Sequence, residues 1–103
     1  MPSVEFRMQT SRFLVELQMF KQGLKVLESV INEDDETVEA WYLLAFCLFK
    51  LKKYTTAEEC CKNVQQLAVK FKVVNPELEA GTLEIYEGIK KELAKQGSDP
   101  EKM

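Results

Sequence analysis

Few residues in this chain are of the types that carry out catalysis or bind metals. The 103 residues contain no histidine and three cysteines, Cys47, Cys60 and Cys61. A reactive thiolate needs a helix N-terminus or a cation beside it, and a structural zinc site needs Cys or His ligands in a CxxC-type spacing. The sequence offers neither arrangement. We therefore expect no metal, no cofactor and three reduced thiols, as in a cytoplasmic and nuclear protein.

Neighbouring carboxylates are the other candidate for chemistry, because two acids on either side of a bond can act as general acid and base. Glu58 and Glu59 are adjacent in a stretch of helical periodicity. Their side chains therefore point about 100° apart and cannot flank one bond. The chain also has no glycine-rich phosphate loop. The sequence predicts a protein that is not an enzyme and has no catalytic residue.

Helices must position whatever functional side chains the chain carries. Hydrophobic residues make up 46% of the sequence and charged residues 30%, with only four glycines and three prolines, which is typical of one small helical domain. The longest apolar run, residues 40–49, is too short for a membrane span of about 20 residues. Residues 1–51 carry the whole net charge of −3, which argues against nucleic acid and anionic membranes and favours a basic partner.

The spacing of apolar residues predicts five helices, over residues 4–17, 21–31, 38–51, 55 to about 73, and 76–96. Ser3 is the expected N-cap of the first helix. A capping box formed by Thr55 and Glu58 should start the fourth. The fifth should begin at Pro76 and end at Gly97. We interpret the acidic run 33–36 as a solvated turn and expect the tail, residues 98–103, to be disordered.

The sequence repeats itself at a distance of 34 residues. Shifting it by 34 positions aligns small and apolar residues: Leu14 with Leu48, Leu17 with Leu51, Phe20 with Tyr54, Gly23 with Ala57, Leu27 with Cys61, and Val30 with Val64. A helix-turn-helix unit repeated at this period is the signature of the tetratricopeptide (TPR) repeat.

The second copy, residues 38–71, resembles a TPR repeat in its residues as well as its period. The predicted repeat core is Trp41, Leu44, Ala45, Leu48, Tyr54, Ala57 and Cys61 there, and Ser11, Leu14, Gly23 and Leu27 in the degenerate first copy, residues 4–37. Val69 replaces the proline that ends the second helix of most TPR repeats, so the fourth helix should run long. The resemblance implies an all-α, right-handed solenoid: one domain, residues 1–97, of two repeats and a capping helix, 76–96.

TPR proteins bind peptides or protein segments on a concave side lined by the first helix of each repeat. By register, the groove positions are Glu5, Met8, Arg12, Val15 and Glu16 in the first repeat, and Glu39, Tyr42, Phe46, Phe49 and Lys50 in the second. An alternative explanation of the apolar stretch 40–49 is burial among the other helices, which we favour for Leu43 and Cys47. Tyr42, Phe46 and Phe49 fit either interpretation.

Two TPR activities can be weighed on these residues. The carboxylate clamp of heat-shock co-chaperones needs Lys, Asn and Arg at positions held here by Met8, Arg12, Leu43 and Phe46, so that activity is disfavoured. The segment 33–44 instead resembles a family of eukaryotic TPR assembly chaperones dedicated to ribosomal protein four of the large subunit, in particular their C-terminal part. This resemblance implies a ribosome-biogenesis chaperone that shields a basic ribosomal protein, without direct contact to nucleic acid or membrane. A generic TPR adaptor, or a subunit that forms a homodimer through an exposed apolar face, remains the alternative.

Overall fold

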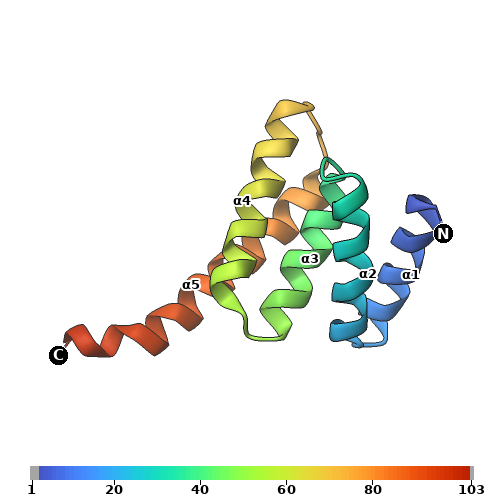
Figure 1. Ribbon diagram of the computed structural model, residues 1–103. Helices are drawn as coiled ribbons and strands as arrows, with labels where there is room; N and C mark the ends of the chain where they lie inside the picture. The colour runs from blue at the N-terminus through green and yellow to red at the C-terminus, as the bar shows by residue number, and fades with distance from the viewer. Residues whose placement is uncertain (1–2, 103) are drawn as a thin grey trace.

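Five helices form the computed structural model, which describes the backbone of residues 3–102 and the side chains of residues 3–95. They are α1 (Val4–Glu16), α2 (Phe20–Glu33), α3 (Val38–Lys50), α4 (Tyr54–Lys70) and α5 (Pro76–Lys102) (Figure 1). The described residues contain no strand, and no described helix is long and apolar enough to span a membrane. The predicted all-α class is confirmed.

The helices stack as two successive hairpins, α1–α2 and α3–α4, followed by α5 (Figure 1). Helix α3 packs against both helices of the first hairpin, and α5 packs in the same way against both helices of the second. Each new helix is thus added to the preceding hairpin in the same manner. This arrangement is that of a solenoid, with α5 covering the end of the second hairpin.

The 34-residue repeat extends to individual backbone hydrogen bonds. In the first turn, Gln18 N–H donates to Val15 O (2.9 Å) and Met19 N–H to Leu14 O (2.8 Å). The same two bonds recur 34 residues later, from Lys52 to Phe49 O and from Lys53 to Leu48 O, and once more after α4. These bonds define the Schellman motif, in which the residue after the helix adopts a left-handed conformation. Gln18, Lys52 and Lys72 have the positive φ angles, 62°, 65° and 54°, that the motif requires.

Small residues allow the helices of each hairpin to cross closely. Ser11, Gly23, Ala45 and Ala57 are all buried. A Cβ atom at Gly23 would lie 3.6 Å from Cys47 Sγ and 3.7 Å from Leu14 Cβ, in ordinary van der Waals contact, so α2 packs closely on both α1 and α3 at this position. All predicted repeat-core residues are buried except Leu14 and Trp41, which are half-buried.

The helix ends agree with the predictions at some positions and differ at others. Ser3 caps α1, since its Oγ accepts from Phe6 N–H at 3.1 Å. The predicted capping box is wrong: α4 begins at Tyr54, and its N-cap, Lys53, makes no side-chain capping bond. The Schellman turn explains this difference, because it passes the chain directly from α3 into α4 and leaves Thr55 inside the helix.

The ends of α4 and α5 also differ from the predictions. Helix α4, with 17 residues, is longer than α2, with 14, but it ends at Lys70 and not near Val73. The left-handed conformation of Lys72 stops it there. Helix α5 begins at Pro76 as predicted but continues past Gly97 to Lys102. The side chains of residues 96–103 lie outside the described part of the structure, and the disorder expected for 98–103 stays a prediction.

Candidate protein-binding groove

The predicted groove residues lie on α1 and α3, and an ion pair joins these two helices. Arg12 donates from Nε to Glu39 Oε2 and from its terminal nitrogen to Glu39 Oε1, both at 2.7 Å. Such a two-point contact fixes the orientation of both side chains. The hydrogen bond to Glu39 raises the pKa of Arg12, and the charge of Glu5 adds to this effect. Arg12 is therefore a permanently charged link across the groove.

The aromatic residues of the predicted groove are partly covered by α5. A Cβ atom at Gly81 would lie 2.5 Å from the Tyr42 hydroxyl, and one at Gly88 would lie 2.8 Å from Phe49 Cζ. The two glycines are seven residues apart and so share one face of α5. This face of α5 packs on Tyr42 and Phe49. Both rings are half-buried, so only part of each is open to a partner.

Phe46, the third aromatic residue, is also engaged within the chain. Its ring meets Phe20 edge to face, with 5.9 Å between the ring centroids. The Lys50 ammonium lies 5.4 Å from the centre of the same ring, within the range of a cation–π contact. Tyr42, Phe46 and Phe49 are all half-buried and do not form a free aromatic patch.

Other predicted groove residues divide between the surface and the core. Glu5 and Glu16 are exposed on α1. Val15 is half-buried against α2, and Met8 is only 2% exposed and belongs to the core, so a partner cannot reach it. The prediction of Met8 as a groove residue is therefore wrong, because the register gives its position along the helix but not how closely the neighbouring helices pack over it. Leu43 and Cys47 are buried, as the alternative interpretation expected.

Helix α5 contributes a wall of the groove that the sequence did not reveal. A hollow of ≈490 Å³ lies between α3 and the start of α5, lined by Val38, Glu39, Tyr42, Val73, Asn75, Glu77 and Leu78. Burial raises the pKa of Tyr42, and the nearby charge of Glu84 raises it further. Glu77 and Glu84 are exposed, and they lie seven residues apart on one side of α5. The paired glycines of α5 were the available signal that this helix lies against an aromatic surface.

The acidic run 33–36 is tied into the fold by several contacts. Glu33 forms an ion pair with Arg7, and Glu36 forms one with Lys70 at 2.9 Å. The backbone carbonyl of Asp35 accepts from Trp41 Nε1–H at 2.7 Å. Two of the four carboxylates thus neutralise cations of this chain. These contacts hold the run in place as a turn. Fewer of its carboxylates are free to attract a ligand than the sequence suggests.

The three thiols are buried and unsuited to reaction. Burial raises the pKa of Cys47 and Cys61 to about 11 and that of Cys60 to about 12. Because the thiolate is the reactive form, these cysteines stay inert near neutral pH. Within the described residues, no group of three or more His, Cys, Asp or Glu side chains is placed to hold a metal ion.

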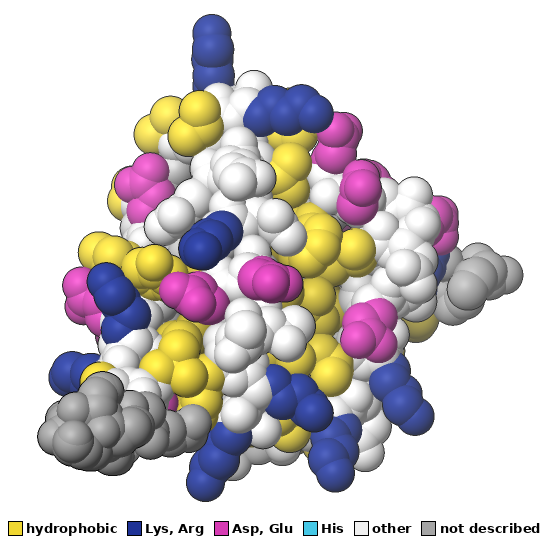
Figure 2. Space-filling model, turned by 60° about the vertical axis from the view of Figure 1, so that its left-hand side comes forward, with side chains coloured by type: hydrophobic (Ala, Val, Ile, Leu, Met, Phe, Trp, Pro, Cys, Tyr) yellow, Lys and Arg dark blue, Asp and Glu magenta, His cyan; other side chains and the backbone are white. Residues whose placement is uncertain are grey.

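Charges are unevenly distributed over the surface. Figure 2 shows one face of the molecule, with several Lys and Arg side chains along its lower edge and Asp and Glu scattered above them between bands of hydrophobic side chains. The three helices assigned to the groove, α1, α3 and α5, all contribute acidic residues to it: Glu5, Glu39, Glu77 and Glu84. The groove is therefore the more promising surface for a basic ligand.

Comparisons with known proteins match the helical repeats. A family model described as "Anaphase-promoting complex, cyclosome, subunit 3" matches residues 2–64, more than half of the chain, which includes α1 to α3 and the first part of α4. A curated protein of Emericella nidulans, "Probable assembly chaperone of rpl4", is 49% identical over 47 residues. The aligned segment is 46% of this chain but only 12% of that relative, so the chain spans a small part of its length.

Proposed function

Since the chain belongs to the TPR-type family of subunit 3 of the anaphase-promoting complex, or cyclosome, we propose that its concave groove binds a basic segment of a partner protein. Repeats of this type support protein binding without catalysis, in keeping with the three buried, protonated thiols. The partner segment would lie across α1, α3 and α5. The hollow between α3 and α5 would hold part of that segment.

The observation that carries this proposal is the unequal charge of the groove. The groove residues include the carboxylates of Glu5, Glu16, Glu39, Glu77 and Glu84 but only two cations. Arg12 is paired with Glu39, and Lys50 lies beside the Phe46 ring and keeps its charge. Exposed carboxylates on α5, Glu77 and Glu84, have no described cation bonded to them. A lysine- or arginine-rich segment would find opposite charge on α1 and on α5, which favours rapid association and the correct orientation.

The finer proposal is that the partner is a ribosomal protein and that the chain acts as its assembly chaperone in the cytoplasm and nucleus. The match to the rpl4 chaperone of Emericella nidulans supports this identity, and the acidic groove supports a basic client. Shielding a basic segment would keep it from aggregating and from binding nucleic acid prematurely. The alternative, a general adaptor, would use the same groove for a segment of different origin.

Binding of purified rpl4 from the same species, measured by fluorescence anisotropy, tests this proposal. The double variant Glu77→Gln, Glu84→Gln should weaken binding at least about tenfold, and the loss should shrink as salt rises, because exposed charges are screened. Glu59→Gln, which removes an exposed carboxylate from α4, is the matched control and should leave the affinity unchanged. Equal affinities for all three proteins would contradict the role of the groove.

A second measurement separates a chaperone from an adaptor. A chaperone should suppress the light scattering of rpl4 diluted into low-salt buffer when the two proteins are at equal concentration. The groove double variant should suppress it much less. If the chain binds rpl4 but leaves aggregation unchanged, the adaptor function is favoured and the chaperone function is refuted.

A further inference from the structure

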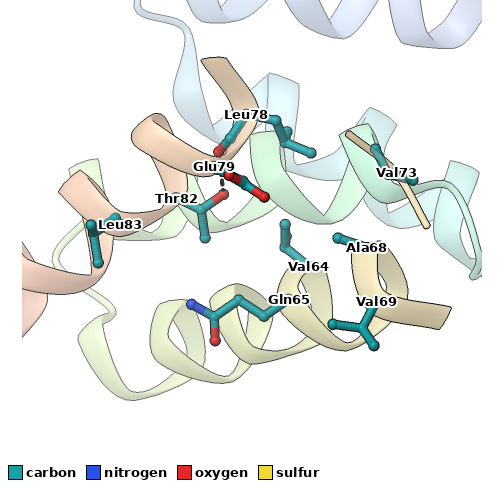
Figure 3. Close-up of a pocket in the computed structure, with 9 residues that line it drawn as sticks. All are labelled: Val64, Gln65, Ala68, Val69, Val73, Leu78, Glu79, Thr82 and Leu83. Atoms are coloured by element: carbon teal, nitrogen blue, oxygen red, sulfur yellow. Dashed lines mark hydrogen bonds between the residues drawn. The ribbon is translucent and has the colours of Figure 1, made fainter. Parts of the chain in front are cut away.

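A second hollow lies on the α4 side of α5, whereas the groove lies on its α3 side. It measures ≈450 Å³, and its lining is mostly apolar, with Val64, Ala68, Val73, Leu78, Thr82 and Leu83 among its residues. Figure 3 shows α5 on one side and α4 on the other, with Val64, Leu78 and Thr82 pointing into the space between them and Leu83 at its edge. No part of the described chain covers this opening.

Backbone hydrogen bonds show which positions of α5 correspond to positions in α1 and α3. The residue four positions after the N-cap donates a backbone bond to the N-cap carbonyl: Arg7 in α1, Trp41 in α3 and Glu79 in α5. These three residues therefore occupy equivalent places, each being the fourth residue of its helix. Arg7 donates to Ser29 and Glu33 of α2, and Trp41 lies beside Leu67 and Lys70 of α4. Glu79 instead lines the open hollow.

The next turn of each helix shows the same difference. Four residues further on, Ser11 and Ala45 are 0% exposed, because the second helix of the hairpin crosses over them. The equivalent residue of α5 is Leu83, a larger and apolar side chain that is 51% exposed. This face of the helix is covered by α2 on α1 and by α4 on α3, whereas on α5 it is exposed at Leu83. In the described part of the chain, no helix takes that place on α5.

We propose that this hollow is the docking site for an amphipathic α-helix of a partner protein, which would lie on α5 as α2 lies on α1 and α4 lies on α3. We infer a helix because the equivalent faces of α1 and α3 are each covered by a helix, α2 and α4. Its apolar side chains, spaced three or four residues apart, would enter the hollow beside Leu78 and Leu83. The site is independent of the concave groove and of the function proposed for it.

Charge at the rim specifies the partner further. On α5, Glu79 and Glu87 are exposed one turn before and one turn after Leu83, on the same side of the helix. On α4, Gln65 lines the hollow, and Lys62 lies one turn before it on the same side of the helix. The docking helix should therefore have Lys or Arg along the edge that faces α5, and its acidic or neutral residues should face α4.

A fluorescein-labelled peptide of about 18 residues, five helical turns, serves as the probe. It carries a leucine stripe with lysines along one edge and glutamates along the other, and a scrambled peptide of the same composition is the control. Full-length protein should bind the patterned peptide saturably and the scrambled one at least about tenfold more weakly. Glu79→Trp, which fills the hollow as Trp41 fills its own position, and Leu83→Asp should each weaken binding by a similar factor.

A matched variant elsewhere on the surface makes the test specific. Phe13 of α1 is 61% exposed and apolar, so Phe13→Asp removes a comparable hydrophobic surface outside the hollow. This variant should bind the peptide normally, while circular dichroism verifies that all three variants keep their helices. Loss of binding in Phe13→Asp, or unchanged binding in both hollow variants, would overturn the proposal.

Sedimentation of the protein alone distinguishes a partner from a second copy. We expect a monomer at every concentration, with no effect of Leu83→Asp on its mass. A concentration-dependent dimer that Leu83→Asp dissociates would assign the hollow to another copy of this chain and would overturn the proposal of a separate partner.

Discussion

The first and second hairpins share a backbone but are held together by different side chains. Their turns contain the same hydrogen bonds 34 residues apart. The first hairpin is closed by the buried guanidinium of Arg7, which bonds to Ser29 and Glu33, whereas the second uses Trp41 at the same position. All three cysteines lie in the second hairpin. The comparison shows that small residues and turn geometry maintain the repeat, while the large side chains at equivalent positions, such as Arg7 and Trp41, differ in chemistry.

The largest expected effect is alkaline unfolding that begins in the second hairpin. Its thiols have pKa values raised from 9.0 to about 11 or 12, so at high pH the unfolded chain ionises before the folded one. Their contribution to stability is complete below about pH 9 and is lost as the pH rises through about 12. Urea unfolding followed by Trp41 fluorescence between these limits should show a falling midpoint.

The matched control for this prediction replaces two of the thiols. A Cys60→Ala, Cys61→Val variant should lose less stability over the same pH range, although it is less stable at neutral pH. Parallel curves for the variant and the parent protein would show that the thiols do not cause the loss.

The next effect concerns the two residues that close the hairpins. Arg7→Leu should lower the free energy of unfolding by about 2 kcal/mol, because it removes the charge-assisted hydrogen bonds that the buried guanidinium makes to Ser29 and Glu33. Trp41→Leu should cost a similar amount, about 2 kcal/mol, through lost packing. Added to Arg7→Leu, Glu33→Gln should have little further effect, since its partner is already gone. Urea unfolding of the double variant measures this. If Glu33→Gln lowers the free energy of unfolding as much in the Arg7→Leu background as in the parent protein, the Arg7–Glu33 contact does not hold α1 to α2.

A smaller effect is expected where α5 rests on the second hairpin. Gly81→Ala should destabilise the protein by about 1 kcal/mol, because its new methyl group would overlap the Tyr42 hydroxyl and outweigh the helix-favouring effect of alanine. In a Tyr42→Phe background the same change should cost less, because the 2.5 Å contact is gone and only the 3.0 Å contacts with the ring carbons remain. A double-mutant cycle by thermal unfolding measures this coupling, and additive effects would place α5 elsewhere.

The smallest effect compares the two equivalent turns. Gln18→Gly and Lys52→Gly should each stabilise the protein by about 0.5–1 kcal/mol, because glycine adopts the left-handed conformation without strain. Lys53→Gly is the control, since Lys53 has a φ of −98° and gains nothing from glycine. If all three variants lose stability alike, the turns are not strained.

The fold was largely predictable because its signals are local. Helical periodicity, the 34-residue shift and the small residues at Gly23, Ala45 and Ala57 are all visible in the chain, and they sufficed to predict two repeats of two helices each and a fifth helix after them. The wrong capping box at Thr55 shows the limit of such signals. A suitable residue pattern was present, but the turn before it had already determined where α4 begins.

The candidate site was less predictable because it depends on contacts between distant segments. The register placed Tyr42 and Phe49 on the groove side of α3, but it could not show that Gly81 and Gly88 rest on them. Nor could it show that Glu33 and Glu36 are paired with Arg7 and Lys70. Charges that look available in a sequence can be neutralised by residues 26 or 34 positions away.

By itself, the sequence determined the helices, their repeat and the side of each helix that is apolar, because these follow from the spacing of residues along one segment. Only the tertiary structure decided which surfaces stay open. Burial and pairing are properties of two or more segments together: α5 covers part of the aromatic floor, the acidic turn is bonded to cations, and the outer face of α5, with Leu83, remains without a helix above it in the described residues.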